Sequence, residues 1–482
     1  MDAVFLAELE RIVGPDGLVR DAGDLLTYES DALVRLRERP AAAVLPDTVD
    51  QVQQVVRLCH RSKVPFVARG SGTGLSGGAL PHPDGVLIVL TRLNRVLDID
   101  IPNQRITVEP GVTNLEVTRR VASFGYYYAP DPSSQVICSI GGNVAENSGG
   151  AHCLKYGFTV HHVLGVEVVL PDGELAHLGG EALDSPGLDL LGVIVGSEGT
   201  LAVVTKVTLR LLRRPEAVQM LLVAFDSTDA AGNAVSDIIS AGIIPAAIEM
   251  MDRTTIRAAE AAVHPGFPDA EAVLIVELDG PRSEVVALFA RVEAVCARNN
   301  GWGVQVARDE AQRGRIWMGR KAAFAAMGRI APNYYVQDGV IPRSKLPEVL
   351  RRIRQLEIES GLTIGNVFHA GDGNLHPLVC YDAAVDGQAD LAEQVATEIL
   401  TYCLDVGGSL TGEHGIGADK ACHMPKMFTT ADLETMQLVR AAFDPDQICN
   451  PDKLFPTPRL CGEVPGPYRA HPAEIAGLID RV

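Results

Sequence analysis

Hydrophobic and polar positions follow two different periods in the first seventy residues. In PDTVDQVQQVVRLCHRSKVP, the apolar residues from Val52 to Cys59 recur at i, i+3, i+4 and i+7, which predicts an amphipathic helix. Thr48 followed three residues later by Gln51 is a capping-box pattern and predicts that the helix begins directly after Thr48. The apolar run VPFVAR, residues 64–69, then predicts a strand that leads into the glycine-rich stretch ARGSGTGLSGG.

The pattern changes near residue 213. From GVLIVL to TKVTLRLL, residues 85–212, short strands and turns prevail, and RRPEA at 213–217 interrupts them. The strands VQMLLVAF, AAIEMM, AVLIVEL and GVQVA then alternate with helices in a β-α-β-β-α-β order of ferredoxin-like style. A second round has the strands YYVQDGVI, TIGNVFHA and NLHPLVCY and helices near 345–360 and 388–406. We therefore expect an α+β fold whose second half is an antiparallel sheet flanked by helices.

Length and charge narrow the class of protein. A chain of 482 residues is expected to form two or three domains. It has no apolar stretch long enough to cross a bilayer, and its first residues lack the basic region of a signal peptide. Nine cysteines without C-x-x-C spacing favour a reducing cytoplasm. The net charge of −19 argues against nucleic acid and anionic membrane surfaces, and an anionic substrate would need local positive charge for its capture.

The stretch Gly72-Thr73-Gly74-Leu75-Ser76-Gly77 matches the G-x-G-x-x-G of a Rossmann dinucleotide site, but its context does not. A Rossmann loop opens into a helix, whereas this one runs into ALPHPDGVLIVL, where Pro81 and Pro83 oppose a helix and another strand follows. The alternative is an ordinary loop between strands. Two further stretches of small residues, at 130–157 and 195–205, make an ordinary loop less plausible. Together the three stretches indicate one long ligand that binds against backbone amides.

These three stretches resemble the FAD-binding domain of the vanillyl-alcohol oxidase/p-cresol methylhydroxylase superfamily. The resemblance rests on PFVARGSGTGLSGGA, PDPSS…SIGGNVAENSGG, GVEVVLPDGE and VGSEGTLAVVT. It implies that the first loop wraps the FAD pyrophosphate and that the other two line the ribityl chain and the isoalloxazine. The first loop has no histidine, so we expect non-covalent FAD. The implied FAD-binding residues are Arg69, Gly70, Ser71, Gly72, Thr73, Gly74, Leu75, Ser76, Pro130, Asp131, Ser133, Gly142, Asn147, Gly150, Glu198, Gly199, Val204 and Asn450.

Histidines and an acid in the second half could form a metal site. In NVFHAGDGNLHPLV, a hairpin turn at Asp372-Gly373 would place His369 directly opposite His376, within reach of one metal. Glu413 and His414 lie in a second glycine-flanked loop, GGSLTGEHGIG. His₂Glu is a zinc ligand set with an open position, and Mn or Fe would also suit it. The alternatives are structural histidines in a half-buried sheet and a polar surface turn.

The second half resembles the C-terminal domain of FAD-linked 2-hydroxyacid oxidases, and among them most of all the flavin subunits of bacterial glycolate oxidases. The matching segments are IWMGRKAAF, DGVIP, NVFHAGDGNLHP, GGSLTGEHGIG and AAFDPDQICNPDKLFP. The resemblance implies a divalent metal, zinc first, on His369, His376 and Glu413, with His414 as catalytic base. Arg320 would clamp the substrate carboxylate, and Lys321 is a weaker candidate. Without the resemblance, both would be assigned to a solvated helix face.

The expected activity is the oxidation of a small 2-hydroxy acid, most simply glycolate to glyoxylate, by hydride transfer to FAD. Oxidation of D-lactate to pyruvate is the alternative, because one methyl group in a pocket is worth only ~1–3 kcal/mol. Leu378 and Val336 stand where D-2-hydroxyglutarate dehydrogenases have polar residues, which disfavours a long diacid. A metallohydrolase without flavin and a non-catalytic flavoprotein subunit are further alternatives.

Partners and domain boundaries complete the prediction. The chain has no iron–sulfur cysteine motif, so flavoprotein and iron–sulfur partner subunits would carry electrons onward. We expect a cytoplasmic protein that reaches the inner membrane only through such partners. The expected domains are an N-terminal helical segment at 1–36, a two-subdomain FAD-binding domain of the p-cresol methylhydroxylase type at 37–214, a substrate or cap domain at 215–456, and a tail at 457–482.

Overall fold

The helix expected after Thr48 is present as α2, Val49–Ser62, in the computed structural model, which describes residues 1–182 and 187–456. Thr48 Oγ1 accepts the amide hydrogen of Gln51 at 3.2 Å, and the expected apolar face is fully buried. The Gln51 carboxamide oxygen caps the amide of Asp47 at 2.6 Å instead of that of Thr48. The expected tail at 457–482 lies outside the described residues.

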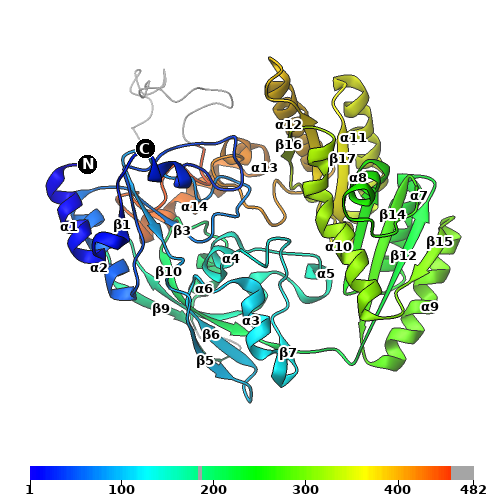
Figure 1. Ribbon diagram of the computed structural model, residues 1–482, viewed down its shortest axis with the longest axis horizontal. Coiled ribbons are helices and arrows are strands. Elements are labelled where there is room, and N and C mark those ends of the chain that lie inside the picture. Colours follow the sequence, from blue (N-terminus) through cyan, green and yellow to red (C-terminus); the bar gives the residue numbers. More distant parts are fainter. Residues whose placement is uncertain (183–186, 457–482) are drawn as a thin grey trace.

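The first half of the chain contains two larger sheets and one of only two short strands (Figure 1). A four-stranded sheet has the order β1-β2-β4-β3, and a five-stranded antiparallel sheet has the order β5-β6-β10-β8-β9. The first sheet comprises β1 (Leu18–Val19), β2 (Ala42–Val44), β3 (Phe66–Arg69) and β4 (Val86–Val89), with α1 (Ala3–Val13) and α2 beside it. The second comprises β5 (Val96–Asp100), β6 (Arg105–Val108), β8 (Val163–Val169), β9 (Leu175–Gly179) and β10 (Val203–Arg210).

The glycine loop joins β3 to β4, which pair in parallel. No helix lies between these strands, as the two prolines predict, so the Rossmann arrangement is excluded by the fold itself. The remaining short elements of this half are α3 (Asn114–Val121), α4 (Ile140–Glu146), α5 (Cys153–Tyr156), α6 (Leu190–Ile194) and the paired strands β7 (Tyr126–Tyr127) and β11 (Leu212–Arg213).

The second half is one seven-stranded antiparallel sheet in the order β15-β12-β14-β13-β17-β18-β16, so the two predicted rounds of strands share one sheet. Helices cover both of its faces, because alternate residues of β12 belong to two separate cores. The strands are β12 (Ala217–Phe225), β13 (Ala247–Asp252), β14 (Ala272–Gly280), β15 (Trp302–Val306), β16 (Asn333–Val336), β17 (Ile364–His369) and β18 (Pro377–Tyr381). One face is covered by α7 (Thr228–Ser240), α9 (Arg282–Arg298), α11 (Leu346–Ser360) and α12 (Gln388–Asp405), and the other by α8 (Arg253–Val263) and α10 (Glu310–Ala326).

The end of the described chain returns to the first half. After α13 (Met424–Met427) and α14 (Thr430–Phe443), Cys449 forms a parallel bridge with Phe66 of β3. The amide of Asn450 donates to the carbonyl of Phe66 at 2.8 Å. In Figure 1 the orange and red segments accordingly lie beside the blue strands.

Candidate active site

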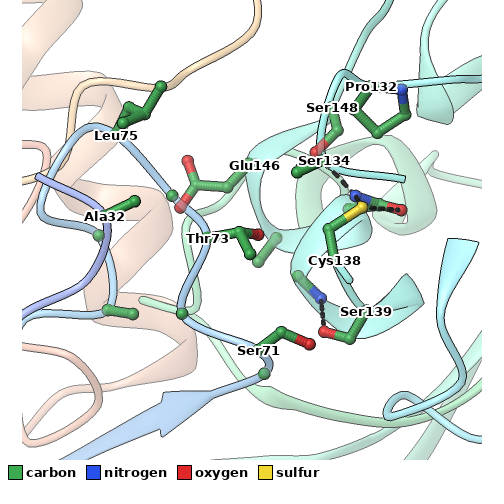
Figure 2. A pocket seen from close by; sticks show the side chains of 18 of the residues that line it. Ala32, Ser71, Thr73, Leu75, Pro132, Ser134, Cys138, Ser139, Glu146 and Ser148 are labelled. Atoms are coloured by element: carbon green, nitrogen blue, oxygen red, sulfur yellow. Dashed lines mark hydrogen bonds between the residues drawn. The ribbon is translucent and has the colours of Figure 1, made fainter. Parts of the chain in front are cut away.

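A cavity of about 540 Å³ lies where the two halves meet. Its walls come from all three glycine-rich stretches and from α10, β16, the turn before β18 and the loop after α12. Figure 2 shows Ser71, Thr73 and Leu75 on one wall, with Glu146, Cys138 and Ser139 facing them from α4 and the segment before it. The three stretches predicted to share one long ligand therefore do line a single cavity.

The first glycine loop is suited to an anionic group. Its amides at residues 71–74 donate no backbone hydrogen bond to any other part of the described chain, so they are free to bind a ligand. Gly72 has a φ of +67°, and a Cβ there would lie 2.2 Å from a terminal nitrogen of Arg69. That guanidinium donates to the carbonyl of Ser30 at 2.7 Å and therefore supports the loop from behind. The positive φ favours glycine at this position, and any other residue would also displace the Arg69 side chain.

The predicted FAD-binding residues divide into two groups. Those that line the cavity are Arg69, Gly70, Ser71, Gly72, Thr73, Gly74, Leu75, Ser133, Gly142, Glu198, Gly199 and Val204. Those that stand behind the lining are Ser76, Pro130, Asp131, Asn147, Gly150 and Asn450. The second group shapes the loops: Asn147 Oδ1 accepts the amide of Val160 at 2.9 Å, and a Cβ on Gly150 would lie 2.5 Å from the Asp131 carbonyl. Their direct contact with FAD stays a prediction.

Asn450 links the last described segment of the chain to two of the glycine-rich loops. Its Nδ2 donates to the carbonyls of Gly78 at 2.9 Å and Glu198 at 2.7 Å, and the residue has a φ of 45°. The carboxylate of Glu198 in turn accepts the amides of Ile416 and Gly417, each at 2.6 Å. Segments far apart in sequence thus hold one another in place around the cavity.

Asp131 joins the second loop to the cap sheet through His152. Its Oδ2 lies 2.8 Å from His152 Nδ1, and His152 Nε2 lies 3.1 Å from Glu277 of β14. Trp317 of α10 donates to the other oxygen of Glu277 at 2.9 Å. Burial opposes charge on His152, but the two carboxylates outweigh it and raise its pKa well above the ordinary value. The sequence alone had indicated no partner for His152.

The hairpin that carries the two histidines differs in register from the prediction. Gly365 pairs with Leu378 and His369 with Asn374, so His376 is not directly opposite His369. The turn contains four residues, 370–373, instead of two, and the register has moved by two positions. A shift of two preserves the face of each side chain because side chains alternate with period two. The imidazoles remain neighbours, with ring centroids 5.1 Å apart.

The three predicted metal ligands converge. Glu413 Oε1 lies 3.2 Å from His369 Nε2 and 3.3 Å from His376 Nε2, and the candidate ligand atoms all lie within 4.8 Å of one another. His376 Nε2 is buried and has no hydrogen-bond partner in the described chain. Two imidazole nitrogens and a carboxylate oxygen with an unsatisfied nitrogen among them fit a divalent ion. The ring of His414 stacks on that of His376 at 5.0 Å and also lines the cavity.

Asp338, which the sequence did not single out, holds the loop that carries Glu413 and His414. Its Oδ2 accepts Thr411 Oγ1 at 2.5 Å and the amides of Gly412 at 3.0 Å, Glu413 at 3.2 Å and His414 at 2.8 Å. Burial works against ionisation, but the neighbouring His414, Lys420 and His376 favour the charged carboxylate and hold the pKa of Asp338 well below its usual range. Its signal was an acid inside the predicted strand YYVQDGVI.

Burial and neighbouring charges have opposite effects on the pKa values of the site residues. Burial raises the pKa of Glu413, but the neighbouring His369 and His376 more than offset this and hold it at about 2. Burial lowers the pKa of His414 to about 4 despite the nearby Asp338 carboxylate. For His369 the effect of burial is exceeded by Glu249 and Glu413, which raise its pKa well above the ordinary value. Two carboxylates thus favour positive charge at the position of His369.

Arg320, predicted to clamp the substrate carboxylate, binds the buried carboxylate of Glu249 in this structure. Its Nε and one terminal nitrogen each lie 2.6 Å from Glu249 Oε2, and the side chain is 2% exposed. Glu249 also lies 2.8 Å from His369 Nδ1, so Arg320 neutralises the acid that orients a predicted ligand. Arg320 does not line the cavity, and its role as a carboxylate clamp stays untested. The signal for Glu249 was an acid inside the apolar strand AAIEMM.

Several other cavity residues were not predicted individually. They include Pro110, Cys138, Ser139, Asn143, Glu146, Phe324 and Tyr334. Four of these, from Cys138 to Glu146, lie within the stretch at 130–157 that the sequence indicated as a whole. Phe324 and Tyr334 come from the second half and reach the cavity only because the two halves meet there.

Comparison with known proteins agrees with this arrangement. Residues 40–179 match the model of the FAD binding domain, and residues 214–454 match that of the FAD linked oxidases, C-terminal domain. The chain is 50% identical to glycolate oxidase subunit GlcD of Escherichia coli K12 over 96% of its length and 92% of that protein. It is 31% identical to the D-lactate dehydrogenase of Anaerostipes hadrus, over 87% of this chain and 90% of that protein.

Solved structures show the same fold. The structure of p-cresol methylhydroxylase with bound substrate superposes with a TM-score of 0.78 at 18% identity, over 94% of this chain and 96% of that one. The predicted α+β class, with its p-cresol methylhydroxylase-type flavin domain, is thereby confirmed. Within 1–182 and 187–456, no helix is both long and apolar enough to span a membrane.

Proposed function

This chain belongs to the FAD-linked oxidases, and we propose that within that family it oxidises glycolate to glyoxylate. The observation that carries the proposal is the meeting of His369, His376, Glu413 and His414 at a cavity walled by the three glycine-rich loops. D-lactate is the second candidate substrate, since a D-lactate dehydrogenase is 31% identical to the chain. A flavin-free metallohydrolase would leave the glycine loops without a ligand.

We propose that FAD is held without a covalent bond by the loop at 69–76 and by the cavity residues of the other two stretches. Bound there, FAD supplies the acceptor for the hydride that leaves C2 of the substrate. The free amides at 71–74 bind the pyrophosphate, and Ser133, Gly142, Glu198, Gly199 and Val204 border the rest of the cofactor. Acid precipitation should leave the flavin in the supernatant, whereas flavin in the pellet would show a covalent bond.

We propose that His369, His376 and Glu413 hold a divalent ion, zinc first, with Mn or Fe as alternatives. Such an ion supplies Lewis acidity toward the substrate hydroxyl and carboxylate. Glu249 orients His369 through Nδ1, and Asp338 fixes the backbone of Glu413. His414 faces the same cavity and takes the hydroxyl proton as general base.

We propose that flavoprotein and iron–sulfur partner subunits receive the electrons, because the chain has no iron–sulfur cysteine motif and its relative in E. coli is named as a subunit. The protein would act in the cytoplasm and reach the inner membrane only through these partners. The domain boundaries at 36, 214 and 456 remain part of the proposal.

The test is an anaerobic visible spectrum of the purified holoenzyme before and after addition of glycolate, D-lactate or L-lactate. Bleaching of the flavin band by glycolate at lower concentration than by either lactate supports the proposal. Preferential bleaching by D-lactate moves the assignment to the second candidate. A flavin band that no 2-hydroxy acid bleaches contradicts the substrate class, and repetition after chelation tests the metal.

A further inference from the structure

The side chain of Glu146, the last residue of α4, forms part of the cavity wall. Figure 2 shows its carboxylate pointing away from α4 and toward the part of the glycine loop that carries Thr73 and Leu75. A Cβ on Gly78, at the end of that loop, would lie 2.4 Å from Glu146 Oε1. A ligand that binds to the free amides at 71–74 would therefore lie close to this carboxylate.

A second carboxylate, that of Glu198, lies beside the first. A Cβ on Gly415 would be 2.2 Å from Glu146 Oε2 and 2.9 Å from Glu198 Oε1, so the two carboxylates border the same glycine. Glu198 accepts the amides of Ile416 and Gly417, which favour its charged form. Glu146 Oε2 is buried and has no hydrogen-bond partner among the described residues. A single proton on this pair would therefore reside on Glu146.

The surroundings of Glu146 favour its neutral form. Burial, and next to it the negative charges of Glu198 and Asp31, raise the pKa of Glu146 well above its ordinary value. Lys420 opposes this rise, but its ammonium lies 3.6 Å from the carboxylate of Asp338 and is shared with it. Burial raises the pKa of Glu198 as well, although its two amide donors oppose the rise. The negative charge around the pair thus exceeds what the nearby cation can neutralise.

Bound FAD would strengthen this preference in two ways. Its pyrophosphate carries negative charge, and a like charge at close range favours the protonated form of a carboxyl group. The cofactor would also fill the cavity and remove the remaining water from the Glu146 side chain, which makes a charge there still less favourable. An ionised Glu146 and bound FAD therefore oppose each other, and protonation of Glu146 removes the conflict.

We propose that Glu146 carries a proton in the FAD-bound protein, and that FAD binding takes this proton from solvent at any pH where the FAD-free protein has Glu146 ionised. The inference rests on the proposed function only in that FAD occupies this cavity, and it is independent of the substrate. A protonated Glu146 offers one hydroxyl donor to the cofactor, whereas Glu198 keeps its charge against its two amides. Glu146 is thus a binding residue for FAD whose protonation state controls the affinity.

The proposal fixes the direction in which FAD affinity depends on pH. A group whose pKa is higher in the complex than in the free protein favours binding below both pKa values, and binding weakens as the pH rises through them. One linked proton limits the rise in the dissociation constant of FAD to about tenfold per pH unit. Lys453 lies near Glu198, and burial lowers the pKa of Lys453 to about 8, so it titrates in the same range. The experiment must therefore separate Glu146 from Lys453.

Fluorescence titration of the flavin-stripped full chain measures the dissociation constant of FAD from about pH 6 to pH 9, and calorimetry in two buffers of different ionisation enthalpy counts the protons taken up. The wild type is compared with Glu146→Gln, which keeps the shape and a neutral donor, and with Glu434→Gln. Glu434 is an exposed acid on α14 outside the cavity lining, so its replacement makes the same change in net charge. Infrared spectra of the holoenzymes report the carbonyl stretch of a protonated carboxylic acid.

In the wild type and in Glu434→Gln, the dissociation constant of FAD should rise roughly three- to tenfold per pH unit above neutral pH, with up to about one proton taken up per FAD. Glu146→Gln should bind FAD within about threefold of the wild type at acid pH and more tightly than the wild type at alkaline pH, with no such proton uptake. The wild-type holoenzyme should show a carboxylic acid stretch that shifts in D₂O and that Glu146→Gln lacks. Any weaker pH dependence that remains in Glu146→Gln measures the share of Lys453.

Several results would overturn the proposal. One is a wild-type FAD affinity that does not change with pH, and another is a Glu146→Gln holoenzyme that keeps every carboxylic acid band of the wild type. Full pH dependence in Glu146→Gln would assign the linked proton to Lys453 instead, and its loss in Glu434→Gln would reduce the effect to net charge. The proposed function fails separately: flavin that no 2-hydroxy acid reduces refutes the substrate assignment, and none of these measurements requires turnover.

Discussion

Replacing Asp338 by Asn should weaken metal binding although Asp338 is not one of the proposed ligands. Its Oδ2 accepts one hydroxyl and three backbone amides from the loop at 411–414. Asparagine keeps one carbonyl oxygen, loses the charge, and turns an NH₂ group toward donors. Lys420 Nζ, buried 3.6 Å from the same carboxylate, would also lose its neutralising charge. Glu413 and His414 would then no longer be held in place.

The magnitude follows from the number of contacts. A hydrogen bond to a charged group contributes ~1.5–3 kcal/mol, and water and the remaining oxygen replace part of what is lost, so a net cost of about 2–3 kcal/mol is expected. That corresponds to roughly a 30- to 150-fold loss of zinc affinity, in line with other changes to groups that support metal ligands. Zinc titration of the metal-stripped protein against a chromophoric chelator measures the change.

Asp382→Asn is the matched control. Asp382 also caps a backbone amide of the cap domain, that of Ala384 at 2.9 Å, but at a surface turn away from the site. Its zinc affinity should equal that of the wild type. If the zinc affinity of Asp338→Asn lies within about threefold of that of the wild type, Asp338 does not position the ligand loop.

Three further outcomes are expected. Gly72→Ala should lower FAD affinity at least ~10-fold in a fluorescence titration, since alanine is disfavoured at positive φ and its methyl group would strike Arg69; unaltered affinity would show that the loop can move aside. Burial lowers the pKa of His162 to about 4, so the stability it contributes is present above pH ~6.5 and is lost, by at most about 3 kcal/mol, as pH falls toward 4. Urea midpoints from pH 7 to 4 should therefore fall less steeply in His162→Leu than in the wild type, and equal slopes would contradict this. Asn450→Ala leaves two loop carbonyls without their donor and should lower both FAD affinity and the thermal midpoint, whereas the exposed Asn103→Ala should change neither.

Much of the fold could be predicted because its signals are local. The helical period at 49–62, the two prolines after the glycine loop, and the strands and helices beyond 217 each depend on residues that are neighbours in sequence. The two histidines lie together as predicted although the predicted hairpin register was wrong. An error of two positions in a hairpin leaves each side chain on its face, so the imidazoles still meet.

The partners of the site residues depend on contacts between distant segments. Arg320 and Lys321 are adjacent and equally charged in sequence, and nothing local separates their roles. A helix turns by ~100° per residue, so one side chain reaches Glu249, 71 positions away, while the other lines the cavity. Asp338 likewise meets the loop at 411–414 only because the segment after β16 and the segment after α12 lie side by side.

By itself the sequence determined which chemical groups this protein has and the local backbone on which each is placed: glycines where amides must be free, two histidines on one face of a hairpin, and a glutamate and a histidine between glycines. Only the tertiary structure decided which charges are neutralised and which remain available. That outcome depends on burial and on distances across the two halves of the molecule, since a carboxylate such as Glu249 neutralises whichever cation the packing brings within hydrogen-bond reach.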